Sequence, residues 1–365
     1  SSLYNNQLFY FLGSSEEGAG AGPSLNNPDL VAEISTNLEF GVDAKFFDNS
    51  LRFNATYYTV DTEDQILQLS LPPTTGANSQ FINAGLIRNS GIELTLSADI
   101  IKNDKFTWTS DLNFSKNNSK IVELSPEIDV QVRERQFNDV VQVGAKVGES
   151  LWTLFGSTYD RDDNGNIVYD SNGLPKVGAI GKIGSTNPDA LANLRNTFTY
   201  ENFSLSLLLD AKFGGDVFSF SDLSRATAGT DVVTLQGREY FTGGQGIPVP
   251  QGAVIDGTLD SEVASRGVNP QNYWGRIGQI SEHWVQDASF VKLREVSLTY
   301  NFSNAILDKL NISKLSLGYF GRNLAILYKN TDNFDPETGF NNSFSGVEFF
   351  GFPSTSSHGI KLNVE

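Results

Sequence analysis

Neither cysteine nor methionine occurs among the 365 residues. Without thiols the chain has no disulfide framework, no thiolate metal site and no cysteine nucleophile. A lack of cysteine is common in exported bacterial proteins. Because the first residue is Ser1 and no methionine is present, we expect the N-terminus to be processed or to begin further upstream.

Long apolar runs and clustered basic residues are also scarce. No run approaches the roughly 18 apolar residues of a membrane-spanning helix, so the sequence predicts neither such a helix nor a signal peptide. Only 26 Lys and Arg stand against 43 Asp and Glu, which gives a formal net charge of −17. Nucleic acid is therefore excluded as a partner, because phosphate binding requires a basic surface.

Histidine is rare as well, and His283 and His358 lie far apart in the chain. Neither has a carboxylate cluster at metal-ligand spacing, and no Gly-x-Ser-x-Gly motif is present. A zinc site and a histidine-based catalytic triad are therefore not expected. We predict that the protein is not an enzyme.

What the sequence does contain is alternation of apolar and polar residues. The clearest case ends the stretch 288–302, where every second residue is apolar: Val296, Leu298, Tyr300 and Phe302. This period of two is typical of a strand with one apolar and one wet face. Val291 and Leu293 are out of step with Val296, so we predict a β-bulge near Glu295.

The same pattern recurs along the whole chain. We predict further strands at residues 37–47, 51–60, 92–100, 106–114, 194–200, 203–213, 314–322 and 360–364, and a tenth at residues 1–12. Tight turns alternate with long loops, chiefly 115–192, 214–287 and 323–357. Outer-membrane barrels have this asymmetry, with short periplasmic turns and long extracellular loops. Polar strand residues would then face a wet lumen, among them Glu39, Arg52, Glu93 and Asp210.

Two all-β architectures fit this alternation. A water-soluble sandwich would bury the apolar faces in a core, but it gives no reason for loops to lengthen at one end only. We therefore predict a transmembrane antiparallel β-barrel, with aromatic residues, 12% of the chain, forming membrane girdles at the strand ends. Loops this long are out of proportion to nine or ten strands, so we expect the chain to be the C-terminal part of a larger barrel.

One loop segment offers a candidate metal site. Asp160, Asp162, Asn164 and Gly165 occupy the first positions of a calcium-binding loop. The twelfth position is Ser171, where such a loop has a bidentate glutamate. A hairpin tip explains the Asp-Asn-Gly-Asn run equally well. Calcium binding and a plain turn both stay open, and no other cofactor is expected.

Aromatic residues in the long loops are candidates for substrate binding. They are Trp152, Tyr273, Trp274 and Trp284, and they lie among Gly, Asn and charged residues. Flat rings could stack on sugar faces or cover a peptide. The alternative is that each ring packs the base of its own loop. As a group, the adjacent pair Tyr273 and Trp274 is the preferred binding candidate.

Several stretches read together resemble the SusC-like branch of the TonB-dependent outer-membrane transporters, in that family's order. They include NNPDLVAEISTNLEFGVDAKFFDNSLRFNATYY (26–58), NAGLIRNSGIELTL (83–96), TWTSDLNFSKNNSKIVEL (107–124), ASFVKLREVSLTYNF (288–302), GRNLAILYKNTDNFDPETG (321–339) and FPSTSSHGIKLNVE (352–365). The resemblance implies a 22-stranded barrel, of which residues 1–365 would be the last nine or ten strands. It also implies an N-terminal plug domain and a TonB-contacting segment, neither of which is in this sequence. Similar proteins usually end on an aromatic residue, so we expect residues beyond Glu365.

The resemblance also implies a function and partners. Such proteins lie in the outer membrane of Gram-negative bacteria, typically Bacteroidota, and import large nutrients, commonly oligosaccharides and sometimes peptides. The energy comes from TonB with ExbB and ExbD, a SusD-like surface lipoprotein caps the mouth, and outer-membrane lipid surrounds the barrel. A non-transporting structural or adhesin barrel is the alternative, and an upstream plug domain would separate the two. An enzymatic barrel would need a catalytic constellation, which the sequence does not contain.

Overall fold

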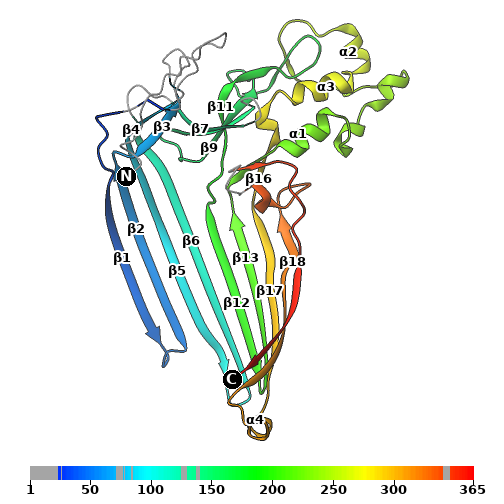
Figure 1. Ribbon diagram of the computed structural model, residues 1–365. Helices are drawn as coiled ribbons and strands as arrows, with labels where there is room; N and C mark the ends of the chain where they lie inside the picture. Colours follow the sequence, from blue (N-terminus) through cyan, green and yellow to red (C-terminus); the bar gives the residue numbers. More distant parts are fainter. Residues whose placement is uncertain are drawn as a thin grey trace, which may run out of the picture.

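The computed structural model describes residues 24–25, 27–70, 77, 79–83, 85–124, 130–136, 140–339 and 346–365. Its main feature is one curved antiparallel sheet of nine strands, with folded connections gathered at one end (Figure 1). Among the described residues, no helix is long and apolar enough to cross a membrane. The predicted tenth strand, at residues 1–12, lies outside the described residues.

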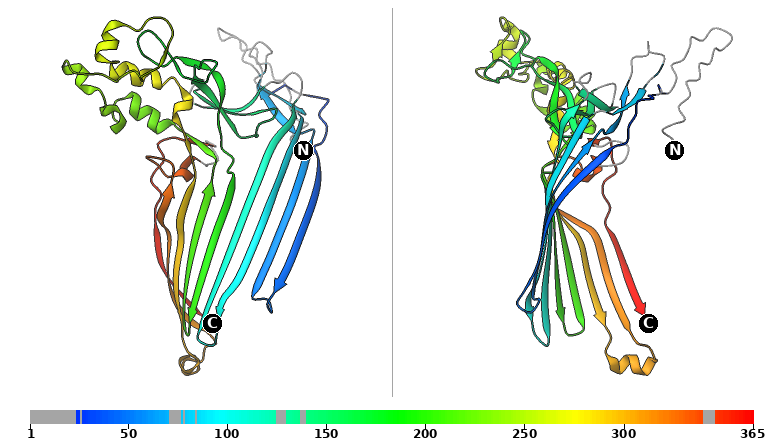
Figure 2. Two further views of the ribbon diagram at one scale, coloured as in Figure 1. Left: turned by 180° about the vertical axis from the view of Figure 1, so that it is seen from behind. Right: turned by 90° about the vertical axis from the view of Figure 1, so that its left-hand side faces the viewer.

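All nine predicted strands are present and follow one another in chain order across the sheet. They are β1 (Ile34–Phe46), β2 (Leu51–Glu63), β5 (Gly85–Lys102), β6 (Phe106–Leu124), β12 (Ala190–Tyr200), β13 (Phe203–Phe213), β17 (Phe290–Asn301), β18 (Leu315–Lys329) and β20 (Ser357–Val364). The sheet is open, with β1 and β20 at its edges. Its curvature is that of a barrel wall (Figure 2), so the predicted architecture is confirmed for this part of the barrel.

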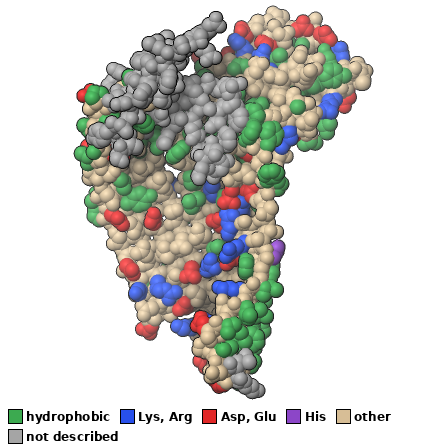
Figure 3. All heavy atoms as spheres, in the orientation of Figure 1, with side chains coloured by type: hydrophobic (Ala, Val, Ile, Leu, Met, Phe, Trp, Pro, Cys, Tyr) green, Lys and Arg blue, Asp and Glu red, His purple; other side chains and the backbone are tan. Residues whose placement is uncertain are grey.

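The pairing register separates the sheet into an apolar and a polar face. Leu205 lies opposite Leu298 on one face, whereas Asn193 lies opposite Asp210 on the other. Large apolar side chains such as that of Phe40, 62% exposed, remain uncovered on the first face, as expected of a surface that meets lipid. Acidic and basic side chains spread over the second face, which is the one seen in Figure 3.

The predicted bulge is confirmed at Arg294. In the pairing of β17 with β13, Leu209 lies opposite Leu293 and Leu208 opposite Glu295, which leaves Arg294 without an opposite residue. The extra residue lets Arg294 and Glu295 both turn toward the polar face. Apolar residues therefore keep their place on the lipid face above and below the bulge.

Tight turns join the strands at the end where the C-terminus lies (Figure 1). Strand β12 passes to β13 through two residues, of which Glu201 has a positive φ of 50°. The connection from β17 to β18 contains the short helix α4 (Asn304–Leu310), which the alternation did not predict. Near this end the ring of Tyr300 lies 4.8 Å from that of Phe203 and 5.0 Å from that of Phe302, consistent with an aromatic girdle.

The long connections form a folded layer rather than open loops, which corrects the expectation from sequence. We call the described residues of 64–83, 125–189, 214–289 and 330–356 the loop layer. It contains β3 (Ile66–Ser70), β4 (Ser79–Asn83), β7 (Val130–Gln136), β8 (Val141–Lys146), β9 (Thr153–Tyr159), β10 (Val168–Tyr169), β11 (Val177–Ser185), β14 (Asp216–Ser219), α1 (Phe220–Thr227), η2 (Val232–Leu235), η3 (Arg238–Thr242), β15 (Val254–Ile255), α2 (Ser261–Arg266), α3 (Pro270–Ile277), η4 (Ser281–Trp284), β16 (Val285–Asp287), η5 (Pro336–Gly339) and β19 (Val347–Glu348). Its core includes Leu154, Phe218 and Val347, each 0% exposed. Several of its strands are very short, and others, such as β8, are buried along nearly their whole length, so alternation does not reveal them.

Strand β6 is also longer than predicted, since it ends at Leu124 instead of residue 114. Residues 115–120 are mostly polar, so the alternation stops while the backbone pairing with β5 continues as far as Leu124. This extension carries the sheet beyond its apolar band and into the loop layer.

Candidate functional site

A cluster of charged side chains lies where the polar face of the sheet meets the loop layer. We call Asp210, Lys292, Arg294, Asp335 and Glu337 the mouth cluster. Arg294 donates to Asp210 Oδ2 from Nε at 2.9 Å and to Glu337 Oε1 from Nη2 at 2.8 Å. Lys292 Nζ donates to the Asp335 carboxylate at 2.6 Å and to Glu337 Oε2 at 2.5 Å. The cluster therefore ties η5 to strands β13 and β17.

Burial makes the two partners of the Lys292–Asp335 pair depend on each other. The side chains of Lys292 and Asp335 are only 4% and 5% exposed. Burial alone would raise the pKa of Asp335, but the hydrogen bond from Lys292, with others, brings that pKa below its ordinary value. The pKa of Glu337 is lowered in the same way, with bonds from Arg294 and Lys292 outweighing burial. Removing one member would leave an uncompensated charge in the wall.

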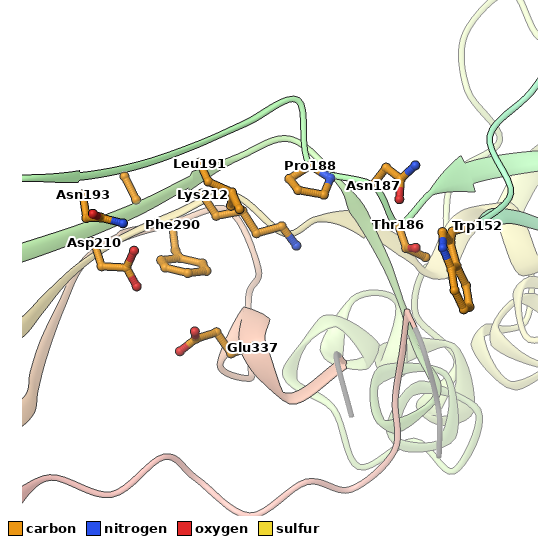
Figure 4. Close-up of a pocket in the computed structure, with 11 residues that line it drawn as sticks. Trp152, Thr186, Asn187, Pro188, Leu191, Asn193, Asp210, Lys212, Phe290 and Glu337 are labelled. Carbon is orange, nitrogen blue, oxygen red and sulfur yellow. The ribbon is translucent and has the colours of Figure 1, made fainter. Parts of the chain in front are cut away.

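A cavity of about 540 Å³ adjoins the mouth cluster. Its lining residues are Trp152, Thr186, Asn187, Pro188, Leu191, Asn193, Asp210, Ala211, Lys212, Phe290 and Glu337 (Figure 4). The ring of Phe290 is 4% exposed and lies 4.8 Å from Lys292 Nζ, so the apolar floor of the cavity also contacts the cluster. Such a mixture of ring faces, amides and carboxylates suits a polar organic ligand.

A second hollow, of about 550 Å³, continues down the polar face of the strands. It is lined by Thr95, Ser97, Asp111, Asn113, Asn193, Arg195, Leu208, Asp210 and Arg294. Asn193 and Asp210 belong to both hollows, so a polar track runs from the loop layer along the sheet. Hydrogen-bonding groups placed at intervals along a wall provide successive weak contacts for a ligand that moves past.

The four predicted aromatic residues do not form one site. Trp152 lies in the wall of the cavity beside the mouth cluster. Tyr273 and Trp274 pack edge-on, with ring centroids 5.3 Å apart, between two apolar clusters of the loop layer. Trp274 also lines a separate hollow of about 360 Å³ beside α1 and α3. A binding role for these three residues stays a prediction.

Trp284 requires a correction. Its side chain is 5% exposed, and its indole Nε1 donates to the backbone oxygen of Ile277 at 3.1 Å. The residue packs in the core of the loop layer, as the alternative from sequence proposed, and it has almost no surface to offer a ligand. A single tryptophan among polar neighbours does not distinguish a core position from a binding position.

The candidate calcium loop has the geometry of a hairpin tip. Asp162 Oδ1 accepts the backbone N–H of Asn164 at 3.0 Å and that of Asn166 at 2.8 Å. Asp160 lies 3.4 Å from Lys176 Nζ instead of turning toward Asp162. Within the described part of the chain, no group of three or more His, Cys, Asp or Glu side chains could hold a metal ion. Both alternatives from sequence, calcium binding at Asp160, Asp162 and Asn164 and a plain turn, stay predictions.

Sequence reasoning did not select the mouth cluster as a site. A signal for it was available, because Lys292 and Arg294 place two cations in a strand whose apolar phase breaks beside them. Their partners Asp335 and Glu337 are distant in sequence and lie in a loop. No periodicity connects them to β17, and only the fold brings the four side chains together.

Comparison with known proteins identifies the family. Residues 1–207 match the family model described as TonB dependent receptor-like, beta-barrel. The chain belongs to this family of TonB-dependent receptors. It is a SusC-like β-barrel protein of the outer membrane of a Gram-negative bacterium.

Relatives and solved structures agree with this assignment. The chain is 25% identical to TonB-dependent receptor P3 of Formosa agariphila, over 93% of this chain and 35% of that protein. It is 24% identical to TonB-dependent receptor SusC of Bacteroides thetaiotaomicron, over 77% of this chain and 27% of that protein. The solved RagAB peptide transporter matches with a TM-score of 0.70 and 20% identity, over 98% of this chain and 39% of that one. The chain thus spans between 27% and 39% of the length of these three proteins.

Proposed function

We propose that this chain is part of the barrel wall of a transporter that imports a large nutrient, an oligosaccharide or a peptide, across the outer membrane. The observation that carries the proposal is the polar track from the cavity at Trp152 to the hollow at Asp111. The track lies on the inner face of a sheet whose other face is apolar. A bulky hydrophilic cargo needs such a wall, because it cannot cross the lipid itself.

Energy and selectivity come from parts outside this sequence. A wide polar lumen is unselective unless it is plugged, and moving a cargo past a plug requires work. We propose that a plug domain closes the barrel, that TonB with ExbB and ExbD supplies the work, and that a SusD-like lipoprotein covers the loop layer. In this scheme residues 1–365 are the C-terminal part of the barrel, embedded in outer-membrane lipid.

The proposal involves no bond making or breaking and no cofactor. The charged groups of the mouth cluster form hydrogen bonds with one another. In this proposal they stabilise the wall and give it a polar surface past which the cargo moves. A barrel that serves only as an adhesin or a structural element would not require a continuous polar track on the lumen side. The track is what favours transport over that alternative.

Measuring which nutrients living cells take up from a mixture tests the proposal. Cells that lack the gene are grown on mixed oligosaccharides and peptides, and mass spectrometry follows what stays in the medium. We expect one chemical class of nutrient to stay in the medium. Cells that lack TonB should leave the same class behind. Complementation with the intact gene is the control. Uptake of every class at the normal rate would remove the import proposal in favour of a non-transporting barrel.

A further inference from the structure

Arg238 differs from the other arginines of the described chain. Each other arginine whose side chain is described lies within 4.0 Å of a carboxylate, including Arg225, Arg266 and Arg276 in the same part of the loop layer. Arg238 has no carboxylate partner among the described residues. In a chain with 43 acidic and 26 basic residues, an arginine left without a counter-charge is conspicuous.

Neutral acceptors hold the guanidinium of Arg238 in place. Nε donates to the backbone oxygen of Thr234 at 2.9 Å, and Nη2 donates to Thr234 Oγ1 at 2.7 Å and to the backbone oxygen of Gly229 at 2.5 Å. These bonds fix the group, but within the described part of the chain its positive charge is uncompensated and its Nη1 donor has no acceptor. A cation that is already oriented binds an anion with little further loss of conformational entropy.

The hollow of about 360 Å³ beside Arg238 is lined by a residue that also has an unused donor. Trp274 lines it, and its indole Nε1 is buried without an acceptor among the described residues. A buried N–H that lacks an acceptor carries an energetic cost. A ligand with acceptor oxygens that reaches Nε1 would remove that cost while it neutralises Arg238.

The remaining lining limits what the ligand can be. Phe241, 61% exposed, and Pro270 give apolar surfaces, so the site suits an organic molecule better than a free inorganic ion. Among the residues that the structure describes, no acidic residue and no second cation line the hollow. One positive charge with planar donors matches a singly charged planar anion, which is a carboxylate.

We infer that the hollow between α1, η3 and α3 binds a carboxylate-bearing ligand, with Arg238 Nη1 and Trp274 Nε1 as donors to the carboxylate. Helices α1 and α3 lie in the loop layer, away from the sheet (Figure 1). The site would therefore capture the ligand outside the barrel. The carboxylate could be that of a sugar acid or that of a peptide C-terminus. The inference does not depend on import, because binding is measured on the purified protein.

Ligand-observed NMR titration of the full-length protein in detergent tests this. The probes are D-glucuronate against D-glucose, and N-acetylphenylalanine against its amide, so each pair differs in the carboxylate alone. We expect the acid of at least one pair to bind about tenfold more tightly than its neutral partner, which corresponds to about 1.4 kcal/mol. Preference for glucuronate identifies a sugar acid as the source, and preference for N-acetylphenylalanine a peptide end.

Variants assign the binding to this hollow. Arg238→Gln should weaken the preferred acid about tenfold, and Trp274→Phe, which keeps the ring but removes the N–H, should weaken it by a smaller factor. Arg276→Gln is the matched control, because Arg276 lies on helix α3 together with Trp274 but its charge is paired with Asp170. If Arg238→Gln lowers the melting temperature, its weaker binding could come from unfolding. The result for Trp274→Phe alone then decides whether the ligand binds in this hollow. Equal binding of acids and neutral partners, or unchanged binding by Trp274→Phe, would overturn the inference.

Discussion

Arg294 Nε donates to the carboxylate of Asp210 at 2.9 Å, across a strand pair in which Arg294 has no opposite residue. The bulge interrupts the regular strand pairing and thereby allows the contact between Arg294 and Asp210. Without it, Arg294 and Glu295 could not both face the lumen while Leu293 and Val296 both face the lipid. The same side chain also reaches Glu337, so the bulge couples the sheet to η5 in the loop layer.

Arg294→Met should loosen this attachment. The substitution keeps much of the side-chain volume but leaves Asp210 and Glu337 with less compensation, at a cost of about 1–3 kcal/mol because the group is partly exposed. We expect faster hydrogen exchange at residues 335–339 with an intact barrel. Arg52→Met is the control, since Arg52 is 39% exposed and 3.7 Å from Asp99, and it should change exchange little. Equal protection of residues 335–339 in both variants would contradict the role of Arg294.

Leu94→Arg should impair membrane assembly, and Leu205→Arg should do the same. Both side chains lie on the apolar face, opposite Ala55 and Leu298 respectively. Arginine near the bilayer midplane costs on the order of 2–4 kcal/mol. Thr95→Arg is the matched control, because residue 95 is adjacent in β5 but faces the lumen. The amount of folded protein in outer-membrane fractions measures the effect, and similar amounts for Leu94→Arg and Thr95→Arg would refute the face assignment.

The double substitution Tyr273→Ala with Trp274→Ala should weaken ligand uptake while leaving barrel levels unchanged. Both rings contact two apolar clusters of the loop layer, so we also expect a loss of stability there, on the order of 1–3 kcal/mol. A variant with Phe at both positions keeps the packing and separates the two effects. Normal uptake by the alanine variant would exclude the pair from the transport path.

The loop layer should lose stability as the pH falls. Burial lowers the pKa of His283 below its ordinary value, and Tyr159 Oη lies 2.7 Å from His283 Nδ1. The unfolded chain then binds the proton more readily than the folded one. The contribution of His283 is therefore present above its unfolded pKa of about 6.5 and is lost as pH falls below that value. The hydrogen-exchange protection factors at residues 281–285, which correct for the intrinsic pH dependence of exchange, should fall between about pH 7.5 and 5.5, and His283→Gln should abolish this fall. A loss of protection that persists in this variant would point to other groups.

Calcium should leave the hairpin tip unchanged. The Asp162 carboxylate already accepts two backbone N–H groups and Asn166 Nδ2. Those bonds from Asn166 and then Asn164 hold the pKa of Asp162 below its ordinary value, so the carboxylate is satisfied without a metal. We expect the melting temperature to be equal with calcium and with a chelator. A higher value with calcium that Asp162→Asn removes would establish the metal site predicted from sequence.

The barrel wall could be predicted from sequence because lipid and water act on opposite faces of each strand. Because of that difference, apolar and polar residues alternate in stretches such as 51–60 and 203–213, and both are strands in the structure. Even the bulge at Arg294 was visible, since one extra residue shifts the apolar phase from Leu293 to Val296.

The loop layer could not be predicted in this way. Its core residues Phe218 and Trp284 come from short elements that are covered on more than one side, and such elements lack a consistent apolar face. The mouth cluster was missed for a related reason. Lys292 and Asp335 are brought together by the course of the chain, and nothing in their local sequence requires the contact.

Isolation of the native complex from the outer membrane, with mass spectrometry of all proteins that co-purify, tests the central claim most directly. The account predicts a longer form of this chain that includes a plug domain, together with a SusD-like lipoprotein. Recovery of a barrel without a plug, alone or with structural partners only, would contradict the import function and favour a non-transporting barrel.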